Sequence, residues 1–276
     1  MSGRQALALL LAAVAGLAAV AGASAWWMRD AVVDQSGFAD RAAAALEQGA
    51  VRDAVEREIV AQVTDRLPPE VPRARVRDVV RAAVASTAFD LELAGAAARF
   101  NDELVQGDAT ATLDVDIGRV LEQTDPELVA LLGDVGRARV ARVHAADLPV
   151  NPARAADLVR GLAAVGPPLA FFALAAALAA ARDRRSALGA FGLAALVASL
   201  LLFAGLELGR AAVRDEVRGG TGLSTAQARD AAVAAWREAT GGVRTVAIAG
   251  AAGGLVLTIA GLGPWGRRRG YAQPST

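Results

Sequence analysis

The sequence predicts a mostly α-helical fold: a four-helix transmembrane region with a mainly helical extracytoplasmic domain, including two short strands, between spans 1 and 2. Four stretches of roughly 20 residues contain no charged side chain. Such a stretch is long enough to cross about 30 Å of hydrocarbon as a helix. Arginines gather in alternate segments between these stretches, and the longest intervening segment has helical periodicity. We therefore expect a multi-pass membrane protein.

The four predicted spans are residues 5–28, 161–181, 186–206 and 245–266. Gly166-Pro167-Pro168 lies within the second span and is expected to interrupt and kink that helix. The first span ends close to Ala23-Ser24-Ala25, which resembles a leader cleavage site. Its apolar run is longer than the 7–15 residues typical of a leader. We expect an uncleaved anchor, with cleavage after Ala25 as the alternative.

Arginine supplies all the basic charge of the chain, and its distribution predicts the orientation. The short segments are 1–4, 182–185 and 267–276, which together hold seven arginines and one acid. The other two segments are 29–160, with 16 arginines and 23 acids, and 207–244, with six and five. Arginine-rich short segments stay in the cytoplasm. This predicts a protein of the cell (plasma) membrane with cytoplasmic N- and C-termini. Trp26, Trp27 and Trp265 lie at span ends, where indole rings favour the interface.

Residues 29–160 are long enough to form a domain with its own core. Val51, Val55, Ile59 and Val63 recur every four residues and so share one face of a helix. An earlier helix is expected to be capped by Asp34 or Ser36, and two further helices are expected near Pro72 and from Phe89.

After Gly107 the pattern changes. Alternating β-branched residues in ATATLDVDI predict a strand, and Val140 and Val143 a second one. Thr124-Asp125-Pro126-Glu127 predicts a helix start, and Asn151-Pro152 another, whose helix continues into the second span. Segment 207–244 is expected to be a loop with a short helix capped by Ser224 and Gln227.

The order of these elements resembles a group of uncharacterised four-span integral membrane proteins common in actinobacteria. The resemblance is carried by VVDQSGFADRAAAAL after the first span, ARDRRSALGAFGLAALV around the third, and LSTAQARDAAVAAW before the fourth. It covers nearly the whole chain and implies the architecture, with no activity and no functional residue.

No catalytic, cofactor-binding or metal-binding residues are predicted. His144 is the sole histidine, and we expect it to be structural. The lack of cysteine excludes disulfides and thiol nucleophiles. Asp108, Asp114 and Asp116 could attract a hard cation if they share a strand face, but the EF-hand spacing is missing and a solvated acidic edge is expected.

Glu207 directly follows the third predicted span, with Arg210 or Arg214 as its expected partner. Acids within membrane helices often mark ion paths. The pairs Gly205/Gly209 and Gly250/Gly254 have the GxxxG spacing that lets helices approach closely, and we expect them to pack the bundle.

These patterns favour a non-enzymatic envelope scaffold, sensor or partner-binding protein that acts through its acidic external domain. The predicted partners are the lipid bilayer and an unidentified envelope or membrane protein, without nucleic acid. The alternative is a transporter or channel component that uses Glu207 and the Gly166-Pro167-Pro168 helix break.

Overall fold

The computed structural model of the chain describes residues 3–66, 71–124, 126–132, 138–144, 151–216 and 225–262. It is mostly helical, as predicted. The chain divides into two compact units. Unit 1 contains Met1–Trp27, Arg160–Leu206 and Gly242–Thr276, and unit 2 contains Met28–Val159 and Glu207–Gly241.

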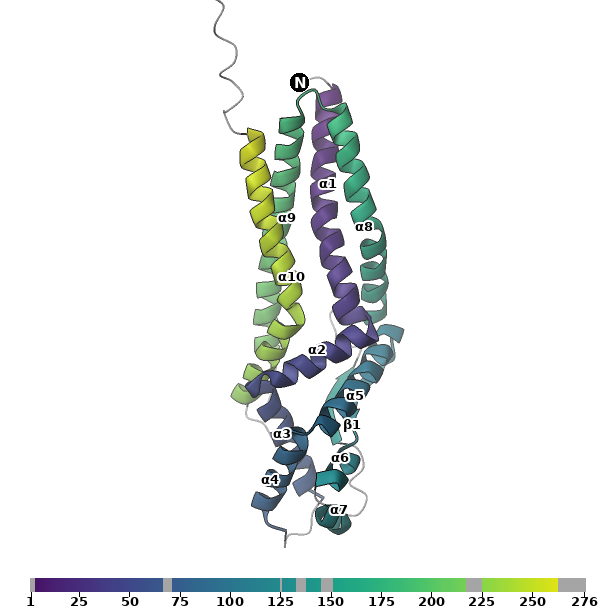
Figure 1. Ribbon diagram of the computed structural model, residues 1–276, viewed down its shortest axis with the longest axis vertical. Helices are drawn as coiled ribbons and strands as arrows, with labels where there is room; N and C mark the ends of the chain where they lie inside the picture. Colours follow the sequence, from purple (N-terminus) through teal and green to yellow (C-terminus); the bar gives the residue numbers. More distant parts are fainter. Residues whose placement is uncertain are drawn as a thin grey trace, which may run out of the picture. The chain divides into compact units, whose positions relative to one another are not determined.

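Within the described residues, four helices are long and apolar enough to cross a membrane, in agreement with the predicted number of spans. They are α1 (Gly3–Met28), α8 (Pro152–Ala180), α9 (Arg184–Glu216) and α10 (Thr225–Leu262) (Figure 1). The shortest has 26 residues. At 1.5 Å per residue it is about 39 Å long, more than the hydrocarbon thickness.

The helices do not end where the apolar stretches end. In segment 207–244, α9 continues to Glu216, and α10 begins at Thr225, where a helix after Ser224 was predicted, so more of the segment is helical than a loop with one short helix. The length of a charge-free stretch indicates how much of a helix can lie in hydrocarbon. The helix itself can continue past that stretch, because alanine, arginine and glutamate are good helix formers. The predicted cap Ser224 lies outside the described residues.

Unit 1 buries small side chains and exposes large ones. Ala12, Ala177 and Ala187 form a fully buried cluster that joins α1, α8 and α9. Large apolar side chains are exposed instead, among them Leu10, Phe171, Phe172, Leu201 and Ile259. This is the distribution expected where lipid chains surround the helices and small residues let the backbones approach.

Glycines allow the closest helix contacts in unit 1. A Cβ atom placed on Gly254 of α10 would lie 2.6 Å from the Gly192 carbonyl oxygen of α9. Gly250 of α10 lies against Ser199 of α9, so the predicted packing role of Gly250/Gly254 is confirmed. Gly205 has no atom within 4 Å of a built Cβ, and its predicted packing role is wrong.

The predicted interruption of the second span is also wrong, since α8 continues as one α-helix through Pro167 and Pro168. Proline removes a backbone donor, but transmembrane helices tolerate this where a neighbouring helix supports them. Here Gly22 of α1 lies against Gly166, and a Cβ on Gly22 would be 2.9 Å from Pro167 Cδ.

Unit 2 has a conventional hydrophobic core. It is built mainly from α2 (Gln35–Glu47), α3 (Gly49–Thr64), α4 (Arg73–Val84) and α5 (Thr87–Gln106). The predicted face of α3 is buried at Val55, Ile59 and Val63. α4 contributes Val76, Val80 and Val84, and α5 contributes Phe89 and Leu93.

Caps define the ends of these helices. Asp34 caps α2, because its side chain accepts a hydrogen bond from Ser36 N at 3.4 Å. Gly107 ends α5 in the left-handed conformation, with φ of 84°, which glycine adopts without strain. A π-helical turn, η1 (Arg29–Val33), follows α1, and the buried amide of Asn101 on α5 donates to its Val33 carbonyl.

Two short strands, β1 (Thr110–Val115) and β2 (Ala138–His144), pair antiparallel with Thr110 opposite His144. Between them lie α6 (Ile117–Thr124) and α7 (Pro126–Leu132). Helix α6 was not predicted from the sequence. Its apolar residues Ile117, Val120 and Leu121 are fully buried in the core. Asp116 Oδ1 accepts the backbone N–H of Arg119 at 3.2 Å, in the first turn of α6.

We expect Gly254→Ala to destabilise the helix bundle by about 1–3 kcal/mol, because the new methyl group meets the backbone of α9. Gly253→Ala is the matched control, since nothing lies within 4 Å of its Cβ position. Thermal unfolding in detergent checks the difference, and equal melting temperatures for the two variants would contradict the packing.

In unit 2, Phe89→Ala should cost about 3–5 kcal/mol, because this side chain is fully buried in the core. Leu91→Ala on the same helix should change stability little, since Leu91 is 71% exposed. Denaturant unfolding of the full chain measures both. A comparable loss in the two variants would show that the core is placed elsewhere.

Candidate functional site

The features singled out from the sequence do not converge on one site. Glu207 is 43% exposed and pairs with Arg210, one turn along α9, at 3.6 Å. His144 is the last residue of β2. Trp265 lies outside the described residues. Gly209 lies beneath the ring of Trp236 within unit 2.

The predicted acidic edge does not hold a cluster that could bind a metal. Asp116 follows β1 instead of sharing a strand face with Asp114. Glu103 Oε2 accepts the backbone N–H of Thr112 at 3.0 Å, and Asp102 Oδ2 accepts from Gln106 Nε2 at 2.7 Å. Within the described residues, no group of three potential ligands is close enough to hold an ion.

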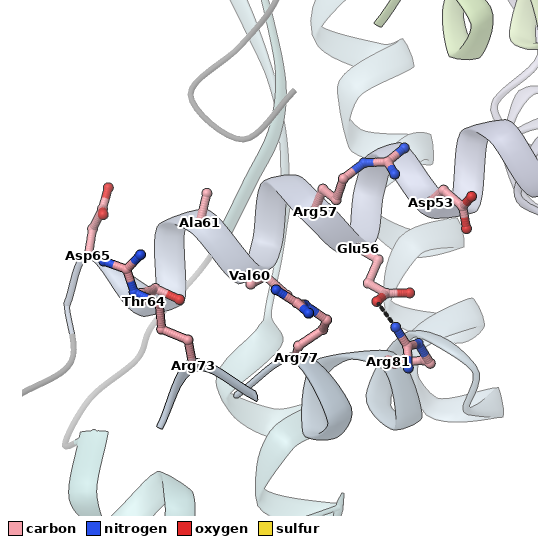
Figure 2. A pocket seen from close by; sticks show the side chains of 10 residues that line it. All are labelled: Asp53, Glu56, Arg57, Val60, Ala61, Thr64, Asp65, Arg73, Arg77 and Arg81. Atoms are coloured by element: carbon pink, nitrogen blue, oxygen red, sulfur yellow. Dashed lines mark ion pairs between the residues drawn. The ribbon is translucent and has the colours of Figure 1, made fainter. Parts of the chain in front are cut away.

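A groove between α3 and α4 of unit 2 is the best candidate site. We call it the arginine groove. Its volume is about 660 Å³, within the range of small-molecule sites. Its lining is rich in charged side chains: Asp53, Glu56, Arg57, Val60, Ala61, Thr64, Asp65, Arg73, Arg77 and Arg81 (Figure 2).

The spacing of α4 creates one wall of this groove. Arg73, Arg77 and Arg81 follow each other every four residues, so they share one face of the helix. The neighbouring face of α4 carries Val76 and Val80, which are buried in the core. Burial of the valines therefore turns the three arginines outward toward the edge of α3, as Figure 2 shows.

One end of the arginine groove is neutralised. Arg81 Nη2 lies 3.2 Å from Glu56 Oε1, and the Glu56 side chain is 13% exposed. Arg81 also lies 3.7 Å from Asp78 in the preceding turn. This ion pair joins α3 to α4 and leaves Arg81 with two acidic neighbours.

The other end holds positive charge without an acidic partner. At this end the lining contains Arg73 and Arg77 of α4, Val60, Ala61 and Thr64 of α3, and Asp65 just after α3. Within the described part of the chain, neither guanidinium makes an ion pair or hydrogen bond. The Asp65 carboxylate points away from both arginines in Figure 2.

The arginine groove was not predicted from the sequence, although the spacing of its arginines is visible there. The segment RARVRDVVR contains arginines at spacing four beside valines at spacing four. This segment predicts a helix with a basic face. The residues that this face meets belong to α3, and the spacing of residues within α4 does not predict them.

Comparison with known proteins adds no further assignment: no family model, curated protein or solved structure matches the chain.

Glu207→Gln should change stability by about 0.5 kcal/mol or less, because an exposed pair one turn apart contributes little. Arg210→Gln is the matched control and should behave alike. Unfolding of both single variants and the double variant measures their coupling. A loss above about 2 kcal/mol for Glu207→Gln alone would point to a buried or functional acid.

Proposed function

We propose that this chain is a non-enzymatic protein of the cell envelope, a scaffold, sensor or partner-binding protein that acts through the unit formed mainly by residues 29–160. One observation carries the proposal: four candidate membrane helices accompany a unit with its own core and an open, charged groove. A unit with its own core can present a binding surface without help from the membrane helices.

The proposed orientation places residues 29–160 outside the plasma membrane and both termini in the cytoplasm. Its support is the arginine excess in 1–4, 182–185 and 267–276. A tight turn of residues 181–183 connects α8 to α9, and Arg184 and Arg185 are the first residues of α9. Gln5 accepts the backbone N–H of Arg182 at 3.2 Å and donates to Ser186, which holds this turn against α1.

The proposal includes kinship with the uncharacterised four-span membrane proteins common in actinobacteria. Its support is the order of elements and the arginine-only, alanine-rich composition. This kinship would explain the architecture and would assign no activity.

The alternative is a transporter or channel component that uses Glu207 and the Gly166-Pro167-Pro168 helix break. The expected break at Gly166-Pro167-Pro168 is a continuous helix supported by α1. Glu207 is half exposed and paired with Arg210 rather than held among membrane helices. Both observations have sufficient structural explanations without a transport path.

Cysteine labelling tests the proposed orientation. The chain has no cysteine, so single Ser36→Cys, Ser186→Cys and Ser224→Cys variants can be treated in intact cells with a membrane-impermeant maleimide. We expect labelling at positions 36 and 224 and none at 186. Ser36 is exposed, so its lack of labelling would not come from burial.

Permeabilised cells provide the control, because all three variants should then react. Labelling of position 186 alone in intact cells would place the acidic unit in the cytoplasm and overturn the envelope function. Solute flux through liposomes that contain the purified protein would favour the transporter instead.

A further inference from the structure

We propose that Arg73, Arg77 and Thr64 form a binding site for a phosphate group at the unneutralised end of the arginine groove. This deepens the proposed function and rests on it, since it names the chemistry that the partner-binding unit recognises. The ligand class is a phosphate ester or diphosphate, either soluble or carried as a lipid headgroup.

The first argument is that the positive charge on α4 is unfavourable as it stands. Like charges four residues apart on a helix destabilise it by a few tenths of a kcal/mol per pair. Arg73 is also the first residue of α4, where the helix dipole opposes a cation. The pair Arg81–Glu56 shows that a single acid on α3 relieves this repulsion. Within the described residues Arg73 and Arg77 make no such ion pair, although Asp65 lines the same end of the groove.

The second argument is the neutral wall opposite the two arginines. Val60 and Ala61 provide an uncharged surface, and Thr64 offers a hydroxyl group that can donate a hydrogen bond. An anion there meets two guanidinium groups and one hydroxyl, and Asp65 is the nearby carboxylate in the described lining. Figure 2 shows Arg73 and Arg77 extending from α4 toward this part of α3.

The spacing of the arginines favours phosphate over a carboxylate. Four helical residues separate their Cα atoms by about 6 Å along the axis, close enough for both flexible side chains to converge on one group. A carboxylate has two oxygens and is satisfied by a single guanidinium fork. A phosphate carries more charge and three acceptor oxygens, so it can accept from two guanidinium groups and Thr64 together.

The rest of the ligand would lie along the groove toward Glu56. At that end Glu56 and Arg81 neutralise each other, so the part of the ligand that lies there need not carry a charge. The groove volume of about 660 Å³ exceeds what a lone phosphate requires. A phosphate with an uncharged substituent therefore fits this shape better than an inorganic ion.

The test uses the purified full-length protein in a nonionic detergent. Calorimetry measures binding of two probes at low salt: inorganic pyrophosphate, and dihexanoyl phosphatidic acid below its micelle concentration. The variant Arg73→Gln/Arg77→Gln removes both guanidinium groups. We expect its Kd to be weaker by about tenfold or more, because charge-assisted hydrogen bonds are lost.

Arg75→Gln is the matched control. It removes the same charge from the same helix, but Arg75 lies 3.6 Å from Glu127 and does not line the groove. Its Kd should stay within about twofold of the wild type. Thr64→Val keeps the side-chain shape and should weaken binding several-fold. If the double variant fails to fold by circular dichroism, Arg77→Gln and Thr64→Val carry the comparison.

Each outcome decides the proposal. Binding of pyrophosphate with loss in the groove variants supports a soluble phosphate ligand, and binding of phosphatidic acid alone supports a lipid headgroup. Absence of binding to both probes, or an equal loss in Arg75→Gln, overturns the site. Because purified protein has no sidedness, this result is independent of the labelling test, and failure of one does not imply failure of the other.

Discussion

Contact between helix backbones is the constraint on which unit 1 depends. Lipid chains are as apolar as leucine, so burial of large side chains does not drive membrane helices together. The helices must instead approach until backbone atoms touch, as α9 and α10 do at Gly192 and Gly254. The same constraint applies where Gly22 of α1 meets Gly166 of α8. Small residues occupy the inside of this unit because a larger one would separate the backbones.

This packing also explains why a double proline is compatible with a continuous helix. Proline leaves a carbonyl of the preceding turn without its usual donor. Close support from α1 at Gly22 holds the helix in place despite this loss. Unit 2 is built differently, because its core buries large apolar side chains, and apolar area removed from water is stabilising. Phe89, Ile59, Val76 and Val80 are accordingly among its most buried side chains.

Charge is arranged on two scales in this protein. Along the chain, 23 acids and 16 arginines give residues 29–160 a negative net charge, while the short segments 1–4, 182–185 and 267–276 are basic. Within unit 2, however, the core orients α4 so that three arginines project from one face. A net negative unit therefore contains a local cationic groove. The function that we propose depends on this local arrangement, which the average charge conceals.

Much of the membrane region could be predicted from residue patterns. Four stretches of roughly 20 residues without charge predicted the number of candidate spans, because a helix that crosses hydrocarbon needs an apolar run of that length. Spacing of four at Val55, Ile59 and Val63 likewise indicated which face of α3 is buried. Local capping chemistry located the starts at Asp34, Pro72 and Pro152, because these residues act on their immediate neighbours.

Other features required the tertiary structure. Periodicity missed α6, whose eight residues span only two turns. The proline pair also predicted a break at Pro167-Pro168, because the local sequence does not show that Gly22 of α1 supports the helix there. The arginine groove shows the same limit most clearly. The sequence by itself determined that Arg73, Arg77 and Arg81 share a helix face, because helical spacing is local. Only the tertiary structure decided that Arg81 meets Glu56 while Arg73 and Arg77 meet neutral residues, because that depends on how α3 and α4 pack.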